Sequence, residues 1–248
     1  MMNSKLRLWS VYRAGNTVSR LTVPTPPSVP WVLVSLLLGS VLGTAQDQVQ
    51  HSMEEMHRLH QDPKAYIAML EDPGRDAYQK PHEVLMALNL KEGDIVADIG
   101  AGSGYFSFRL AHHVGDKGRV YAADINPDMI LHMNRRIRDL GVKNMITVLS
   151  DPDDPLLGKA SVDLVFICEV WHHIEDQPKY LAQIRHILKP GGRVVMIDFQ
   201  KKELPVGPPV EMKIAREDLL RQMESSGFRL AKEHTFLPYQ YFLVFALQ

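Results

Sequence analysis

The feature that most constrains the fold is a regular alternation of short apolar runs with longer segments of helical periodicity, beginning after Gly93. Five of the apolar runs predict buried strands, at residues 95–99, 119–125, 145–149, 162–168 and 193–199. Helices are predicted at residues 106–114, 126–141, 179–188 and 216–226. Strands connected through helices run parallel, so the pattern predicts an α/β fold with a doubly wound sheet and helices on both faces.

Two further apolar runs, residues 228–236 and 241–246, close the sequence without a helix between them. They predict an antiparallel hairpin at one edge, which makes the sheet seven-stranded and mostly parallel. A chain of 248 residues, 45% of them hydrophobic, is long enough to bury the core of such a sheet. Cys168 is its only cysteine, which excludes an internal disulfide and a zinc site built on several thiolates.

The first 46 residues have a different character from the rest of the chain. They contain no acidic residue and four basic ones, which leaves 24 basic against 29 acidic residues in the remainder. An uncharged run at residues 31–43 follows the basic part. As a helix it would span about 20 Å, short of the roughly 30 Å of a bilayer core. Gly43 and Ala45 then provide the small residues of a secretory cleavage site.

Residues 1–45 are therefore expected to be a signal peptide or a membrane anchor, with the protein exported (periplasmic or secreted) or held at a membrane. A mitochondrial presequence and a buried N-terminal helix are the alternatives. Residues 46–78 are expected to be a helical lead-in, and residues 79–248 the main domain. His57 and His60 could pair on a helix face as metal ligands, but no further ligand set accompanies them, so no metal site is expected.

A glycine-rich loop follows the first predicted strand directly, in the segment Asp98-Ile-Gly-Ala-Gly-Ser-Gly104. Glycine is required where the backbone turns sharply and a ligand lies against it, and such loops sit at the carboxyl end of a central strand, where open α/β sheets bind ligands. The dinucleotide fingerprint G-x-G-x-x-G would need glycine at position 105, which is Tyr105 here. The spacing therefore counts against a nicotinamide cofactor.

Asp124 lies at the end of the second predicted strand, 20 residues after Gly104. An acidic side chain at this position can accept hydrogen bonds from both hydroxyls of a ribose. The alternative, a charge that favours the start of the next helix, is already provided by Asp128. Asp124 is therefore predicted to bind a nucleoside.

Taken together, these motifs resemble the class I S-adenosylmethionine-dependent methyltransferases, nearest in style to the ubiquinone/menaquinone-biosynthesis type and related small-molecule enzymes. The matching pieces stand in the family's order at residues 96–104, 124, 150–152, 162–165 and 188–192. The resemblance implies a Rossmann-like fold and S-adenosyl-L-methionine as the methyl donor.

The resemblance also implies a set of cofactor contacts. Asp98 and the glycine loop would hold the methionine part, Asp124 the ribose, and Asp151 the adenine amino group with Pro152 beside the ring. Gln79 is a further candidate contact to the methionine carboxylate. The full implied set is Gln79, Asp98, Gly100, Ala101, Gly102, Ser103, Gly104, Asp124, Ile125, Asp151, Pro152 and Cys168.

Methyl transfer from a sulfonium is an in-line displacement that depends mainly on alignment, with a general base needed only if the acceptor loses a proton. The family's acceptor lies beyond the fourth strand, where Glu169 and His172 are the candidate bases and Trp171 could stack on an acceptor. His173 is interpreted as a core residue.

The acceptor is expected to be a small molecule, lipid-like or a quinol, bordered by the loops at residues 205–209 and 238–242. A nucleic-acid substrate is disfavoured because the chain after residue 46 is net acidic and has no long basic run. Two alternatives stay open: a non-catalytic module that binds S-adenosylmethionine, and a nicotinamide oxidoreductase.

Overall fold

The computed structural model describes residues 61–248. The predicted signal peptide or anchor, the early part of the lead-in and the His57/His60 pair lie outside the described residues, so those predictions stay untested. Within residues 61–248, no helix is long and apolar enough to cross a membrane.

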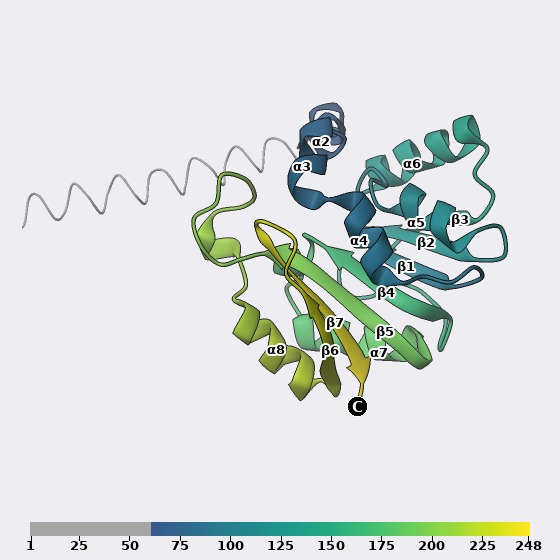
Figure 1. Cartoon of the computed structure of the whole chain (residues 1–248). Coiled ribbons are helices and arrows are strands. Elements are labelled where there is room, and N and C mark those ends of the chain that lie inside the picture. The colour runs from purple at the N-terminus through teal and green to yellow at the C-terminus, as the bar shows by residue number, and fades with distance from the viewer. Residues whose placement is uncertain (1–60) are drawn as a thin grey trace, which may run out of the picture. The chain divides into compact units, whose positions relative to one another are not determined.

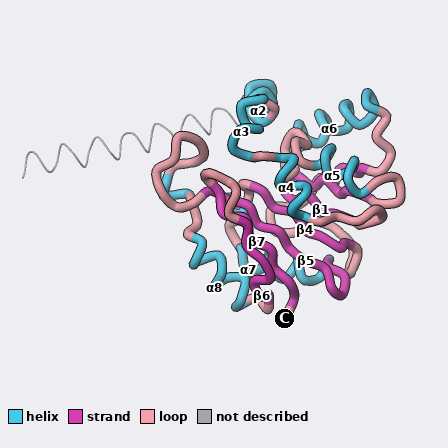
Figure 2. The backbone as a smooth tube through the Cα atoms, viewed as in Figure 1, coloured by secondary structure: helices cyan, strands magenta, loops and turns pink. Residues whose placement is uncertain are grey.

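A single sheet of seven strands forms the centre of the described part (Figures 1 and 2), in the order β3-β2-β1-β4-β5-β7-β6. The pairs β3–β2, β2–β1, β1–β4 and β4–β5 are parallel, whereas β7 is antiparallel to both β5 and β6. The strands are β1 (Ile95–Ile99), β2 (Arg119–Asp124), β3 (Met145–Leu149), β4 (Val162–Cys168), β5 (Leu188–Phe199), β6 (Phe228–His234) and β7 (Gln240–Leu247). The predicted seven-stranded sheet and its edge hairpin are confirmed.

Most helices begin where the sequence offers a proline or a capping side chain. Asn126 accepts a hydrogen bond from the Asp128 N–H at the start of α6, and Gly141 ends that helix in the left-handed conformation, as the sequence predicts. The helices are α2 (Pro63–Leu70), α3 (Asp76–Gln79), α4 (Pro81–Leu88), α5 (Ser107–Val114), α6 (Pro127–Leu140), α7 (Gln177–Ile187) and α8 (Arg216–Ser225), with short 3₁₀ turns η1 (Pro73–Arg75), η2 (Trp171–His173) and η3 (Val210–Met212).

The sheet separates two hydrophobic cores because side chains alternate between its faces. In β4, Leu164 and Phe166 pack into the core shared with α4, α5 and α6, whereas Val165 and Ile167 pack into the core shared with α7 and α8. Figure 1 shows these two groups of helices on opposite sides of the strands. The carboxyl ends of β1, β2, β4 and β5 are thereby held side by side at one edge.

Strand β5 differs from the prediction at its start. The sequence places a turn at residues 189–192, whereas in the structure β5 already begins at Leu188. The pairing with β4 shifts there from Val162–Leu188 to Leu164–Arg193, so the intervening residues form an irregularity within the ladder. Lys189 pairs with Asp163 at 2.8 Å across it. Proline and glycine are common both in bulges and in loops, so the composition of residues 189–192 does not distinguish the two.

Candidate active site

The glycine loop is held against strand β2 by its own backbone. The N–H groups of Gly100 and Ala101 both donate to the Ala123 carbonyl, at 2.8 and 3.0 Å. The Gly104 N–H closes the turn by donating to the Ala101 carbonyl at 2.9 Å. Ser103, within this loop, is buried, and its hydroxyl has no hydrogen-bond partner among the described residues.

Gly100 has no room for a side chain. Its φ of 69° is left-handed, and a Cβ there would lie 2.3 Å from Cγ2 of Val170, which follows strand β4. Gly102 is approached from the other side, since a Cβ on it would lie 3.0 Å from Cδ1 of Leu70 in α2. The loop is therefore enclosed by the β4 loop and by the lead-in helix.

Asp98, at the end of β1, is 3% exposed and accepts a hydrogen bond from the Ser107 hydroxyl at 2.5 Å. Burial raises the pKa of Asp98 to about 7, and the nearby charge of Asp124 adds to the rise. A buried carboxylate is stabilised when a cation lies beside it, and the ammonium group of the implied cofactor would be such a cation.

The Asp124 carboxylate accepts two hydrogen bonds from the backbone. Its Oδ2 accepts from the Gly102 N–H and its Oδ1 from the Asn126 N–H, each at 2.8 Å. Burial raises its pKa, although these backbone hydrogen bonds oppose the rise. The following Ile125 is 59% exposed. The carboxylate thus lies beside the glycine loop, as the sequence predicts.

The two predicted adenine contacts lie at the surface after β3. Asp151 and Pro152 are exposed, and the backbone of Asp151 pairs with that of Asp154 in an isolated bridge. The loop is joined to β2 because the Ser150 N–H donates to the Asp124 carbonyl at 3.0 Å. Nothing in the structure tests their contact with adenine, which stays a prediction.

At the end of β4, Cys168 and Glu169 contact residues that precede the sheet in the sequence. The Cys168 thiol donates to Oε1 of Gln79, a fully buried residue of α3, at 3.7 Å. Burial raises the pKa of this thiol well above its usual value, which makes it a poor nucleophile. Glu169 has a left-handed φ of 59°, an uncommon conformation for this residue type.

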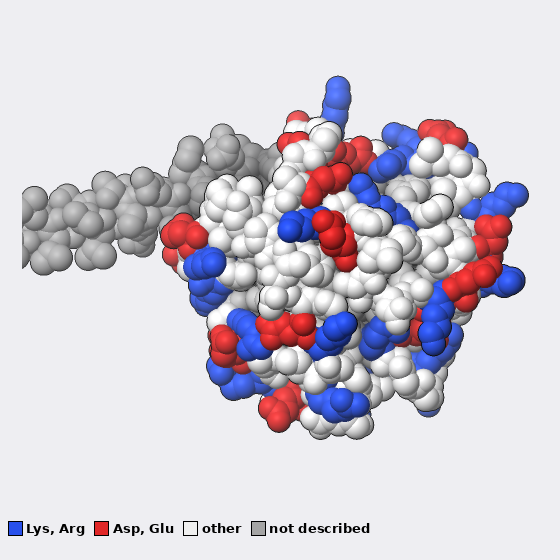
Figure 3. Space-filling view, in the orientation of Figure 1, with Lys and Arg blue, Asp and Glu red and all other residues white. Residues whose placement is uncertain are grey.

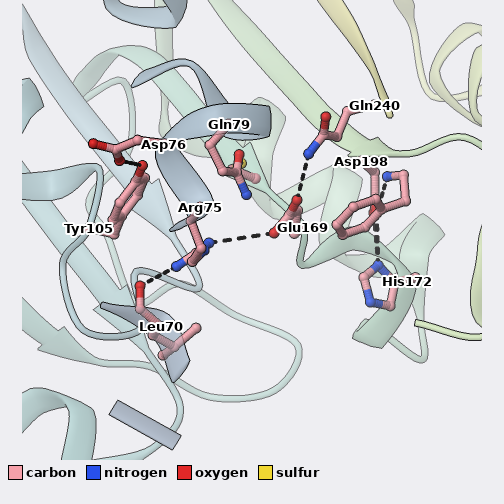
Figure 4. Close-up of polar contacts among 11 residues, drawn as sticks. Leu70, Arg75, Asp76, Gln79, Tyr105, Glu169, His172, Asp198 and Gln240 are labelled. Atoms are coloured by element: carbon pink, nitrogen blue, oxygen red, sulfur yellow. Dashed lines mark hydrogen bonds and ion pairs between the residues drawn. The ribbon is translucent and has the colours of Figure 1, made fainter. Parts of the chain in front are cut away.

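Two side chains hold the Glu169 carboxylate (Figure 4). Gln240 of β7 donates to its Oε1 at 3.0 Å, and Arg75 forms an ion pair with it at 3.5 Å. Burial raises the pKa of Glu169, whereas the positive charge of Arg75 lowers it. Tyr78, whose own pKa is raised by burial and by Glu169, lies close by.

Of the two histidines after β4, it is His172 and not His173 that is buried. The side chain of His172 is 3% exposed, and its Nδ1 lies 3.0 Å from both carboxylate oxygens of the buried Asp198. His173, interpreted as a core residue, is exposed. Both belong to the 3₁₀ turn η2, in which adjacent residues point about 120° apart, so only one of them can face β5.

The lead-in covers the glycine loop. Glu71, after α2, accepts from Arg136 at 2.5 Å and contacts His132 at 2.9 Å, both in α6. Burial raises the pKa of Tyr66 in α2 to about 12, and the charge of Asp124 adds to the rise. The sequence does not predict this role of α2, since helical periodicity alone does not show what a helix packs on.

Three residues that contact the predicted site are not identified individually from the sequence: Arg75, Gln240 and Asp198, although Gln240 lies in the loop at residues 238–242 that is expected to border the acceptor. Their contacts with Glu169 and His172 join residues 94, 71 and 26 positions apart, and Arg75 lies in a turn without any recognisable motif. Within residues 61–248, no cluster of three or more histidine, cysteine or acidic side chains could hold a metal ion.

A Gly100→Ala variant tests the close contact with Val170. The added Cβ would introduce backbone strain and overlap Val170, and we expect a loss of about 2–5 kcal/mol in the free energy of unfolding, measured in urea. Gly141→Ala is the matched control, because Gly141 has a similar φ of 67° but open space around it, so only the strain of about 1–2 kcal/mol should remain. Equal losses in the two variants would contradict the contact.

Comparison with known proteins agrees with this geometry. Residues 90–233 match a family model described as a methyltransferase domain. The ubiquinone/menaquinone biosynthesis C-methyltransferase UbiE of Shewanella sp. (strain W3-18-1) is 28% identical over 131 residues, 52% of each chain, and that of Psychromonas ingrahamii is 32% identical over 111 residues, 44% of each. The chain thus spans about half the length of the curated relatives it matches.

Solved structures of methyltransferases are also similar to this chain. A SAM-dependent methyltransferase from Aquifex aeolicus superposes with a TM-score of 0.72 and 29% identity, covering 75% of this chain and 99% of that one. The [4+2]-cyclase SpnF, 18% identical with a TM-score of 0.56, shares the fold alone. These matches favour a methyltransferase over a nicotinamide oxidoreductase. The chain belongs to the family of class I S-adenosylmethionine-dependent methyltransferases.

Proposed function

We propose that the protein transfers a methyl group from S-adenosylmethionine to a small, partly apolar acceptor. The observation that carries the proposal is the enclosed glycine loop, which joins Asp98 and Asp124 at the carboxyl ends of β1 and β2. That arrangement fits the cofactor chemically: two carboxyl groups for ammonium and ribose hydroxyls, and the unpartnered buried hydroxyl of Ser103. The bound cofactor would supply an electrophilic methyl group on a positively charged sulfur.

The residues of the chain would bind and align rather than react covalently. Displacement at a methyl group needs the acceptor atom in line with the bond that breaks, and proximity provides most of the rate enhancement. Asp98 and the loop would hold the methionine part, and Asp124 the ribose. The half-buried Cys168 thiol, which donates to Gln79, would act on the cofactor by contact alone and not as a nucleophile.

A cluster of aromatic rings on the predicted acceptor side supports an apolar part in the acceptor. Tyr78 lies 6.1 Å from the ring of Tyr239 and 6.4 Å from that of Phe199, measured between centroids. Tyr239 belongs to the loop at residues 238–242, and Gly207 of the loop at 205–209 packs on Phe199. Basic and acidic side chains intermingle on the face seen in Figure 3, which offers no basic surface for a nucleic acid. A lipid-like molecule or a quinol meets these conditions.

Glu169 is the better candidate base of the two. It follows the end of β4, its carboxylate accepts from Gln240, which is next to Tyr239 in the sequence, and buried carboxyl groups with raised pKa values suit proton transfer near neutral pH. His172 instead faces Asp198 and is enclosed, so we assign it a role in holding the turn after β4.

The cofactor proposal is tested by calorimetric titration with S-adenosylmethionine, S-adenosylhomocysteine and NADH. We expect one site for the first two and none for NADH. Asp124→Asn should weaken binding about 10- to 100-fold, because hydrogen bonds to charged groups contribute about 1.5–3 kcal/mol. Asp128→Asn, an exposed acid in the first turn of α6, is the control and should bind normally. Binding of NADH alone would contradict the proposal.

The assignment of the base needs an acceptor, which a screen of phenols, quinols and amines with mass-spectrometric detection of S-adenosylhomocysteine can provide. With an acceptor that loses a proton, Glu169→Gln should lower kcat about 100- to 10,000-fold. His172→Ala should mainly lower the melting temperature, since it leaves Asp198 buried without its partner. The reverse pattern would assign the base to His172. Binding of the cofactor without product from any acceptor would favour the non-catalytic alternative.

For residues 1–45 we propose a membrane anchor that keeps the domain on the side where the cofactor is made. The support comes from the sequence alone: basic residues followed by an uncharged run. Protein from the native host should pellet with membranes at full mass, and protease added to intact cells or organelles should leave it uncut. A soluble species with the mass of residues 46–248 would contradict the anchor and favour a cleaved signal peptide.

A further inference from the structure

Arg75 occupies the space between the glycine loop and strand β4. It ends the turn η1, and its side chain is 14% exposed. Figure 4 shows the guanidinium group between Leu70, whose carbonyl accepts from it, and the carboxylate of Glu169. Its central carbon also lies 4.6 Å from the centroid of the Tyr105 ring, directly after the glycine loop. The charge of Arg75 is therefore available both to the loop and to Glu169.

The electrostatics of this edge require such a cation. Asp98, Asp124 and Glu169 are three partly or fully buried carboxyl groups at the ends of neighbouring strands. The methionine part of S-adenosylmethionine would add a fourth, its own carboxylate, on the side of the loop. A buried carboxylate without a cation or several hydrogen bonds costs several kcal/mol, so the new group must find a positive partner. Arg75 has the matching fork of N–H donors. Arg136 also reaches the loop, where it donates to the Ser103 carbonyl at 3.3 Å, but it is already paired with Glu71.

We propose that Arg75 exchanges partners when the cofactor binds. It pairs with Glu169 in the free protein, and it pairs with the methionine carboxylate in the loaded one. Glu169 is then released toward the acceptor, so that the candidate base becomes available only after the donor is in place. Arg75 is thus a binding residue for the cofactor and a positioning residue for Glu169. This inference rests on the proposed function.

Arg109 provides a matched control for the charge and the stacking of Arg75. Its guanidinium carbon lies 4.3 Å from the same Tyr105 centroid, and it donates to the Tyr105 carbonyl at 2.6 Å. Its side chain is 40% exposed, however, and its ion pair is with the exposed Asp76 at 3.7 Å. Removal of Arg109 disturbs the same ring without removing the cation beside Glu169.

The experiment compares two ligands that differ only in the carboxylate. S-adenosylhomocysteine and its decarboxylated analogue are titrated calorimetrically into the full chain, as wild type, Arg75→Gln and Arg109→Gln. We expect Arg75→Gln to weaken S-adenosylhomocysteine about 10- to 100-fold and the analogue less than about threefold, since only the former has the group that Arg75 binds. Arg109→Gln should change the affinity for both ligands by the same factor. The readout is binding, so no acceptor is needed.

Two results would overturn the inference. Equal weakening of both ligands by Arg75→Gln would show that Arg75 only supports the lead-in, and no weakening would remove it from the site. A wild type that binds neither ligand would instead overturn the proposed function itself.

The exchange has its own test in Glu169→Gln. This variant removes the group that competes for Arg75, so S-adenosylhomocysteine should bind more tightly, by about 3- to 10-fold, while the decarboxylated analogue is unaffected. A merely structural role for the Arg75–Glu169 pair predicts weaker binding of both ligands. Unchanged or weaker binding of S-adenosylhomocysteine would refute the exchange.

Discussion

The contact between Gly100 and Val170 is the constraint on which the site depends. Strands β1 and β4 are parallel neighbours that end at the same edge, and the loops that follow them must pass each other. They can do so only because Gly100 has no side chain where Val170 lies. Glu169, one residue earlier, takes a left-handed conformation next to this contact, and its carboxylate then meets Arg75 and Gln240. One missing Cβ thus links the predicted cofactor loop with the predicted acceptor side.

The sequence predicts the fold closely, because each strand of a parallel sheet that is covered on both faces is an apolar run of recognisable length. It predicts Asp98, the glycine loop and Asp124 for a similar reason: each follows a strand directly, and the sheet brings strand ends together. Where a strand ladder contains a bulge, as at residues 189–192, composition does not distinguish it from a turn. Nor does it determine which of two adjacent histidines in a 3₁₀ turn faces the protein, so the interpretation of His173 as a core residue is wrong.

The contact of Arg75 with Glu169 is not predictable from the sequence. Arg75 is 94 positions from Glu169, in a short turn that has no motif, and only the packing of the lead-in on the sheet brings the two charges to 3.5 Å. Charge pairs of this kind matter because burial raises the pKa of Asp98, Asp124 and Glu169 alike. A site with three buried carboxyl groups is stabilised by a ligand that carries positive charge. S-adenosylmethionine carries such charge on both its ammonium group and its sulfur.

The residues around Glu169 also explain why family membership does not identify the acceptor. The family model covers residues 90–233, and therefore includes the glycine loop, Asp124 and Glu169 itself. Arg75 and Gln79 precede that range, and Tyr239 and Gln240 follow it. The part shared with other methyltransferases thus supplies the donor site and the candidate base, whereas the groups that surround the base come from segments outside the shared part. Acceptor choice would then be encoded in the lead-in and in the β6–β7 hairpin, so those segments are where relatives with a different acceptor should differ most from this chain.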